Sequence, residues 1–158
     1  MYAIRRILHP TDFSEPATAA LEVAISMAEE YGAELSLLHV CEPLMVMAGE
    51  GFPQIPPNDA EEALARLNSI EVPLPPGRLF RHLVVGEPAA EIVREANEGS
   101  CDLIVMGTHG RTGLNRLLMG SVAEGVSRHA PCPVLTVREI PRRCEIDRVA
   151  RKRELARA

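Results

Sequence analysis

The sequence reads Leu103-Ile-Val-Met-Gly-Thr-His-Gly-Arg-Thr-Gly-Leu-Asn-Arg-Leu-Leu-Met-Gly-Ser121 at its most informative point. The stretch begins with four apolar residues and a glycine, a pattern typical of a strand buried on both faces. Glycines at positions 107, 110 and 113 permit positive φ angles and a close approach of the backbone to a ligand. Ser121 precedes apolar residues at helical spacing, so we expect its side chain to cap a helix.

A strand, a glycine loop and a helix start, in that order, favour the binding of a phosphate. They collect backbone N–H groups at the positive end of a helix dipole. The usual phosphate motifs are absent, because there is no G-x-G-x-x-G and the only lysine, Lys152, lies too late for G-x-x-x-x-G-K-[ST]. The glycine spacing is instead Gly107, two residues, Gly110, nine residues, and Gly120-Ser121.

Composition limits the classes of function. The 158 residues carry a net charge of −5 with only 3% aromatic residues, which argues against a nucleic-acid partner. No apolar run approaches the ~20 residues that span a bilayer, and the N-terminal apolar run is too short for a signal peptide, so we expect a cytoplasmic protein without a membrane partner. The four cysteines show no ligand-like spacing, and we expect no metal site.

The rest of the chain alternates between strand and helix patterns. We expect strands over residues 4–10, 34–41, 78–85, 101–106 and 134–137. Helices are expected after Ser14 and up to Gly32, from a cap at Asn58 or Asp59, after Gly86-Glu87-Pro88, and from Ser121 to about Arg128. Such alternation predicts an α/β three-layer sandwich with a mostly parallel sheet. Residues 1–140 form one predicted domain, and residues 141–158 form a basic tail.

The predicted topology places two loops at the same edge of the sheet. In open α/β sheets, ligands bind beyond the carboxyl ends of the strands, where the strand order reverses. Pro10-Thr11-Asp12 follows the first strand and the glycine loop follows the fourth. If these strands are neighbours, Thr11 and Asp12 hold a base or sugar while the glycine loop holds phosphates. Asp12 alone is equally compatible with a turn residue that accepts nearby backbone N–H groups.

Three motifs resemble the universal stress protein family over residues 2–138. They are Ile-Leu-His-Pro-Thr-Asp-Phe-Ser at 7–14, the glycine spacing from Gly107 to Ser121, and Pro-Cys-Pro-Val-Leu at 131–135. The resemblance implies an adenine nucleotide alpha hydrolase-like fold, with a five-stranded parallel sheet of order 3-2-1-4-5 and helices on both faces. It also implies a homodimer formed through the last strand, Val134 to Val137, since an exposed edge strand invites pairing.

The same resemblance implies a site for ATP, or for AMP or ADP, which Mg²⁺ could accompany. Val40 would meet the adenine, and Met106 ends the strand that leads into the glycine loop. The positions that would contact the adenosine and the phosphates are Pro10, Thr11, Asp12, Gly107, His109, Gly110, Gly120, Ser121 and Val122. The segment from Glu42 to Gly77 is shorter and richer in proline than is usual in the family.

The leading hypothesis is an ATP- or AMP-binding regulatory protein of the universal stress response. No neighbour in the sequence orients His109 as a general base, and Ser121 lacks the G-x-S-x-G elbow of a nucleophile, so we assign no catalytic residue. Two alternatives remain: a slow ATPase, and a scaffold whose pocket is not catalytic and whose tail engages a partner. From Arg142 to Ala158 that tail carries seven basic and three acidic residues.

Overall fold

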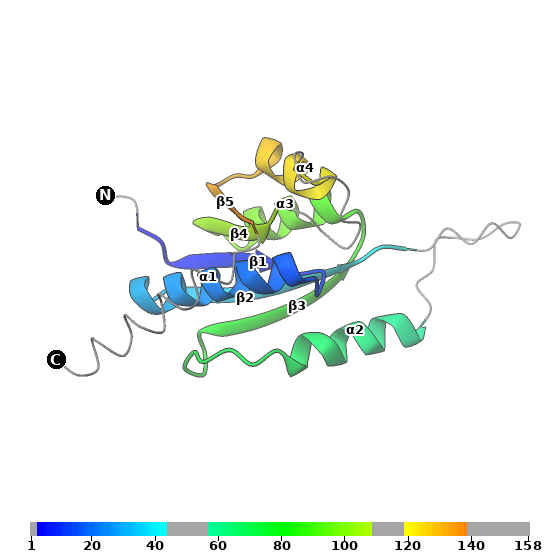
Figure 1. The fold of residues 1–158 in the computed structure, drawn as a ribbon, viewed down its shortest axis with the longest axis horizontal. Helices are drawn as coiled ribbons and strands as arrows, with labels where there is room; N and C mark the ends of the chain where they lie inside the picture. The colour runs from blue at the N-terminus through cyan, green and yellow to red at the C-terminus, as the bar shows by residue number, and fades with distance from the viewer. Residues whose placement is uncertain (1–2, 44–56, 109–118, 139–158) are drawn as a thin grey trace, which may run out of the picture.

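A computed structural model describes residues 3–43, 57–108 and 119–138 of the chain. Strands and helices alternate along it (Figure 1). Their bounds are β1 Arg6–Pro10, α1 Glu15–Tyr31, β2 Glu34–Cys41, α2 Pro57–Ser69, β3 Leu79–Val85, α3 Pro88–Glu98, β4 Leu103–Gly107, α4 Ser121–His129 and β5 Val134–Val137. None of the described helices is both long enough and apolar enough to cross a membrane.

The five strands in the described residues all pair in parallel, in the order β3-β2-β1-β4-β5. The predicted strand order is therefore confirmed. The chain winds outward from β1 in one direction through β2 and β3, and in the other direction through β4 and β5. The strand order reverses between β1 and β4, and ligands bind at such a point in open α/β sheets.

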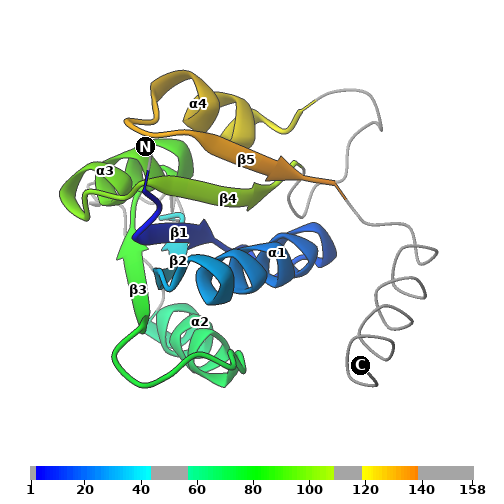
Figure 2. The ribbon, with the colours of Figure 1, turned by 90° about the vertical axis from the view of Figure 1, so that its left-hand side faces the viewer.

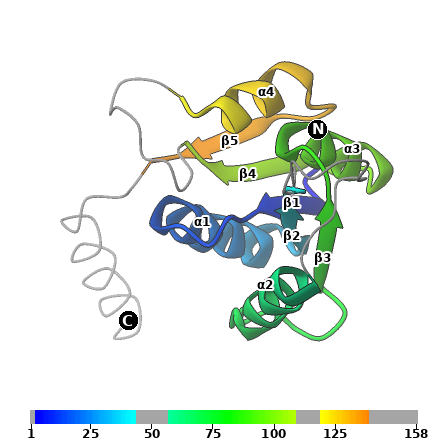
Figure 3. The ribbon, with the colours of Figure 1, turned by 90° about the vertical axis from the view of Figure 1, so that its right-hand side faces the viewer.

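Helices cover both faces of the sheet, as the two end-on views in Figures 2 and 3 show. On one face, α1 and α2 pack over a cluster that includes Ile7, Leu35 and Leu67. On the other face, α3 and α4 pack over Leu8, Leu38 and Ile104. The three-layer sandwich predicted from the alternation of elements is confirmed, and its core is almost entirely aliphatic.

Helix α1 has the ends that its sequence predicts. The Ser14 hydroxyl accepts the N–H of Ala17 at 3.3 Å, and Gly32 ends the helix with a φ of 66°. Its buried face consists largely of alanines, which let the helix axis lie close to the sheet. The sequence did not reveal the role of Arg78, whose guanidinium donates to the carbonyls of Ala28 and Ala33 at the C-terminal end of α1.

Two predicted strands, β1 and β4, begin later in the structure than in the prediction, and Asp102, the residue before β4, bonds to the start of β1. The Asp102 carboxylate accepts the N–H groups of Arg5 and Arg6 at 2.8 and 3.0 Å. β1 therefore starts at Arg6 rather than residue 4, and β4 starts at Leu103 rather than residue 101. In the same way Arg78 binds the carbonyls at the end of α1, and β3 begins at Leu79, one residue later than predicted.

Helix α2 begins at Pro57, before the predicted cap at Asn58 or Asp59. Proline is favoured in the first turn of a helix, because its missing N–H would have no helical partner there. The helix is therefore present where the sequence predicts one, and only its first residue differs.

Helices α3 and α4 approach each other through small residues, and this contact generates a prediction. A Cβ added at Gly125 would lie 2.9 Å from the Cβ of Ala89. Alanine inside a helix normally gains about 1 kcal/mol over glycine, but crowding of this kind costs ~1–3 kcal/mol. We expect Gly125→Ala to lower the free energy of unfolding by about 1 kcal/mol, measured by urea denaturation.

The matched control for that variant is Ala89→Gly in the same chain. Removing the opposing Cβ should restore most of the lost stability, because the crowded contact no longer exists. A stabilising effect of Gly125→Ala on its own would contradict the close approach of the two helices.

Candidate functional site

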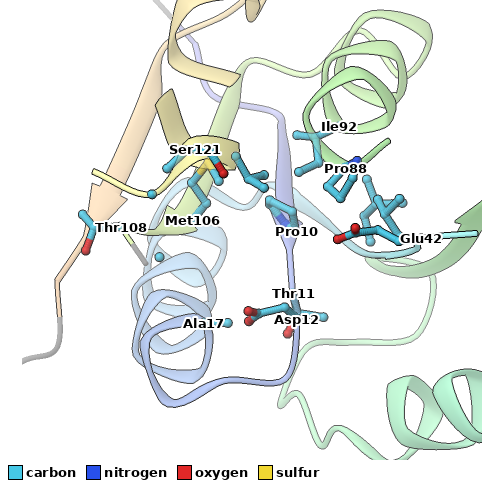
Figure 4. A pocket seen from close by; sticks show the side chains of 16 residues that line it. Pro10, Thr11, Asp12, Ala17, Glu42, Pro88, Ile92, Met106, Thr108 and Ser121 are labelled. Atoms are coloured by element: carbon cyan, nitrogen blue, oxygen red, sulfur yellow. The ribbon is translucent and has the colours of Figure 1, made fainter. Parts of the chain in front are cut away.

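A cavity of about 340 Å³ opens at the carboxyl edge of the sheet, between the ends of β1 and β4. Figure 4 shows Glu42 and Pro88 on one side of it and Thr108 and Ser121 on the other. The cavity is lined by Pro10, Thr11, Asp12, Ala17, Leu38, Val40, Glu42, Pro88, Ile92, Met106, Gly107, Thr108, Gly120, Ser121, Val122 and Ala123. Its size falls within the range of small-molecule sites.

The structure brings the predicted site residues together in this cavity. Nine of them line it: Pro10, Thr11, Asp12, Val40, Met106, Gly107, Gly120, Ser121 and Val122. The other two, His109 and Gly110, lie outside the described residues. Residues from four separate parts of the chain therefore meet at the point where the strand order reverses.

The turn after β1 is held rigidly by its own side chains. Asp12 Oδ1 accepts the N–H of Ser14 at 3.1 Å and its hydroxyl at 2.5 Å. The Thr11 hydroxyl accepts the N–H of Phe13, which has a φ of 63°. Asp12 thus performs the turn role and also lines the cavity, so the two alternatives drawn from the sequence are compatible.

His39 anchors the same turn from β2. Its Nδ1 lies 2.7 Å from the carbonyl oxygen of Thr11, and since a carbonyl only accepts, the imidazole donates. The imidazole also packs against the Phe13 ring at a centroid distance of 4.4 Å. The Arg66 guanidinium lies over the same Phe13 ring, 4.4 Å from its centroid. These contacts give His39 a structural role in holding the turn.

Gly107 is also required for packing within the fold. Its φ is not in the left-handed region, and an added Cβ would lie 3.0 to 3.2 Å from backbone atoms of Pro16 and Ala17. The glycine therefore allows the end of β4 to approach the first turn of α1.

The two described ends of the glycine loop are tied together. The N–H of Gly120 donates to the carbonyl oxygen of Thr108 at 2.8 Å, and the N–H of Thr108 donates to Val137 at 3.0 Å. The start of α4 is thus attached to the end of β4, which in turn is attached to β5. This places the N-terminus of α4 at the cavity wall.

The predicted cap of α4 is wrong by one residue. Gly120, with φ −61° and ψ 151°, occupies the N-cap position without a side-chain hydrogen bond, and Ser121 is the first helical residue. Gly120 is extended because its N–H is bound to Thr108 and its carbonyl accepts the N–H of Glu124. The exposed Ser121 hydroxyl is therefore not used as a cap, and it lines the cavity.

The charged side chains of the described cavity lining are two carboxylates, Asp12 and Glu42. Arg111 and Arg116 of the glycine loop lie outside the described residues. Within the part of the chain that the structure describes, no group of three or more His, Cys, Asp or Glu side chains could hold a metal ion. Donors to an anion in the described wall would therefore be hydroxyls and backbone N–H groups rather than charged side chains.

The sequence reasoning missed several lining residues. Glu42 follows β2 directly, so its position at the carboxyl edge was available from the strand order. Pro88 and Ile92 come from the first turns of α3, and only the three-dimensional packing shows that this helix reaches the cavity. Thr108 directly follows Gly107, and its contact could have been inferred from adjacency alone.

His9, beside this cavity on β1, is fully buried and neutral. Its Nδ1 lies 2.8 Å from the carbonyl oxygen of Val105. Burial lowers the pKa of the imidazole from 6.5 to about 4, against smaller opposing effects of the Val105 hydrogen bond and the Asp12 charge. Charging the ring in place is costly, because a buried cation loses its hydration.

This lowered pKa gives a prediction for stability as a function of pH. Between pH 6.5 and 4 the unfolded chain binds a proton at His9 that the folded chain does not, so stability falls as the pH falls. From pH 7 to pH 4 we expect the protein to lose about 3 kcal/mol of unfolding free energy that the His9→Asn variant does not lose. Urea denaturation at each pH measures the difference, and parallel pH profiles for the two proteins would contradict it.

The fold and the position of the cavity define a class of protein. A five-stranded parallel sheet of order 3-2-1-4-5, covered by helices on both faces, is an adenine nucleotide alpha hydrolase-like fold. The universal stress protein family model matches residues 3–138. The chain belongs to the universal stress protein family, and the resemblance noted in its three motifs is confirmed.

Individual relatives agree with this assignment. The universal stress protein MJ0531 of Methanocaldococcus jannaschii is 36% identical over 141 residues, covering 85% of this chain and 82% of the relative. The solved structure of MJ0577 from the same organism is 34% identical, with a TM-score of 0.73 over 89% of this chain and 99% of that one. The structure of an Archaeoglobus fulgidus universal stress protein in complex with dAMP is 25% identical, with a TM-score of 0.60 over 87% and 99% of the two chains.

Proposed function

We propose that this protein binds an adenine nucleotide, ATP or AMP, in the cleft between β1 and β4, and that it serves as a regulatory protein of the universal stress response. The observation that carries the proposal is the convergence of nine sequence-predicted residues on one cavity with a helix N-terminus in its wall. The dAMP complex of the Archaeoglobus fulgidus relative supports an adenine nucleotide as the ligand class.

The α4 side of the cavity suits the phosphates. The first N–H groups of a helix have no partners within the helix, and they lie at the positive end of its dipole. Here the N–H of Gly120 is already bound to the Thr108 carbonyl, so the donors at the cavity are the backbone N–H groups of Ser121 and Val122 and the exposed hydroxyl of Ser121. These groups bind an anion without a charged side chain, as helix N-termini do in many phosphate sites.

The opposite side suits the nucleoside. Pro10, Val40 and Ile92 provide apolar surface for the flat base, while the Asp12 and Glu42 carboxylates can only accept hydrogen bonds. An adenine amino group and ribose hydroxyls are donors of the kind that such acceptors bind. A phosphate placed on this side would meet two like charges, so the orientation of the nucleotide follows from electrostatics.

A Mg²⁺ ion, if it accompanies ATP, would be held mainly by phosphate oxygens, as is common for this ion. The two carboxylates lie with the nucleoside in this proposal, and no general base is placed at the phosphate end by the described residues. We therefore assign the protein a binding role in which the nucleotide is retained.

Calorimetry with nucleotide-free protein tests the proposal. We expect the wild type to bind ATP and AMP, and we expect Ser121→Asp to abolish this binding while Ser121→Ala weakens it by about tenfold or less. The aspartate repels phosphate from the start of α4, yet it favours the helix itself, because a negative charge at this end complements the dipole. Adenosine, which lacks phosphate, should bind all three proteins with similar affinity.

Two outcomes would count against the proposal. Absence of binding by the wild type to every adenine nucleotide would remove it. Phosphate release from ATP above the buffer rate, abolished by His109→Ala with binding intact, would favour the slow ATPase instead. Mass spectrometry of small molecules released from the purified protein identifies which nucleotide it carries.

We also propose that two copies pair through β5, at the open edge of the sheet. The carbonyls of Pro133 and Val137 accept hydrogen bonds from Ile104 of β4 and from Thr108, the residue after it. Because backbone groups alternate along a strand, the N–H and C=O groups of Val134 and Thr136 point to the open edge. No other described strand pairs with that edge. Antiparallel pairing with a second copy would satisfy these groups, as exposed edges invite.

A proline on this edge tests the pairing. Thr136→Pro removes one outward N–H, and edge strands tolerate proline because their bonds to the sheet are kept. We expect the wild type to sediment as a dimer and Thr136→Pro as a folded monomer with an unchanged circular dichroism spectrum. A wild-type monomer at the highest soluble concentration, or a variant that still dimerises fully, would exclude pairing through β5.

A further inference from the structure

The two central strands separate before they reach the edge of the sheet. Registered pairs between β1 and β4 end at Leu8 and Ile104. By contrast, β1 stays paired with β2 as far as Pro10, and β4 stays paired with β5 as far as Gly107. The opening is therefore confined to the β1–β4 seam, and Pro10, Met106 and Gly107, which lie beyond the last registered pair, line the cavity.

Pro10 accounts for the end of the pairing. The carbonyl of Arg6 accepts the N–H of Asp102, on the β4 side, whereas the N–H of Thr11 donates to the carbonyl of Leu38, on the β2 side. Backbone N–H and C=O groups point alternately to the two sides of a strand, so those of the even-numbered residues of β1 point toward β4. Pro10 is the next such residue, and it has no N–H to donate.

The acceptor left without a backbone donor is the carbonyl oxygen of Val105. In a parallel ladder with Leu8 opposite Ile104, the N–H of residue 10 would meet the Val105 carbonyl. This carbonyl lies in a fully buried residue, where an unpaired acceptor is destabilising. The structure places the Nδ1 of His9 2.8 Å from this same oxygen.

The imidazole has no other hydrogen-bonding role among the described residues. A carbonyl oxygen only accepts, so Nδ1 carries the proton and donates. The other ring nitrogen, Nε2, is buried and has no partner in the described part of the chain. The ring is fully buried, so its one hydrogen bond is the bond to β4.

We propose that His9 is a positioning residue of the nucleotide cleft, whose side chain replaces the ladder bond that Pro10 eliminates. A side chain spans a wider gap than a backbone N–H does. His9 thus keeps β1 and β4 attached while leaving between them the space that the nucleotide enters. This inference rests on the proposed function and adds to it the group that sets the width of the site.

Two substitutions at His9 separate positioning from simple packing. His9→Leu keeps an apolar side chain but removes the donor, whereas His9→Asn keeps a side-chain N–H near the position of Nδ1. We expect His9→Leu to weaken ATP binding by about tenfold or more, and we expect His9→Asn to recover most of that loss. Leu35→Val is the control, because Leu35 is buried at the far end of β2, and it should lower stability without changing the affinity.

A second substitution returns the missing backbone donor. Pro10→Ala in the His9→Leu protein gives Val105 a ladder partner again, so the stability toward urea should recover. The affinity for ATP should not recover, because β1 and β4 then pair further along and narrow the cleft. Recovery of both properties, or of neither, would overturn the inference.

The outcomes also separate this inference from the function on which it rests. If the wild type binds no nucleotide, the proposed function fails, and with it the positioning role. If the wild type binds and His9→Leu binds equally well, only the inference fails. An affinity loss in His9→Leu no larger than that of Leu35→Val at equal stability would likewise overturn it.

Nitrogen-15 NMR of the His9 side chain tests the hydrogen bond directly. It should show a neutral ring protonated at Nδ1, and a proton at Nε2 would contradict the assigned hydrogen bond.

Discussion

The burial of β1 and β4 on both faces is the constraint on which the rest of the structure depends. Ile7, Leu8, Ile104 and Val105 are at most 2% exposed, so the middle of the sheet has room for neither water nor a ligand. In parallel strands, every carboxyl end lies at the same edge. Polar and glycine residues therefore gather at this edge, and the candidate cavity lies where β1 and β4 stop pairing.

Much of the fold follows from local patterns in the sequence, and the failures have identifiable causes. The apolar runs, the cap at Ser14 and the left-handed Gly32 each act within a few residues, and these predictions hold. Arg78 and Asp102 act across 45 or more residues, on Ala33 and on Arg5 and Arg6, and no local pattern reveals such partners. The starts of β1, β3 and β4, which these two residues contact or precede, are placed too early by the sequence.

The candidate site shows the same division. Pro10, Thr11 and the glycine positions could be named from the sequence, because the ends of neighbouring parallel strands must meet. The reasons behind individual residues could not. Gly107 admits the first turn of α1, and Ser121 is displaced from the cap because Gly120 is bound to Thr108. The roles of Gly107 and Ser121 both depend on distances between helices and strands, which cannot be read from composition or from the spacing of residues in the sequence.

The hydrogen bond between Gly120 and Thr108 has a consequence for how members of such a family can diverge. Closing a loop restricts the chain, and that restriction grows only slowly with the number of residues enclosed. With both ends of the segment 109–118 tied at 2.8 Å, substitutions or insertions within it need not disturb β4 or α4. The chemistry presented to a ligand can therefore change while the sheet and its core are inherited intact.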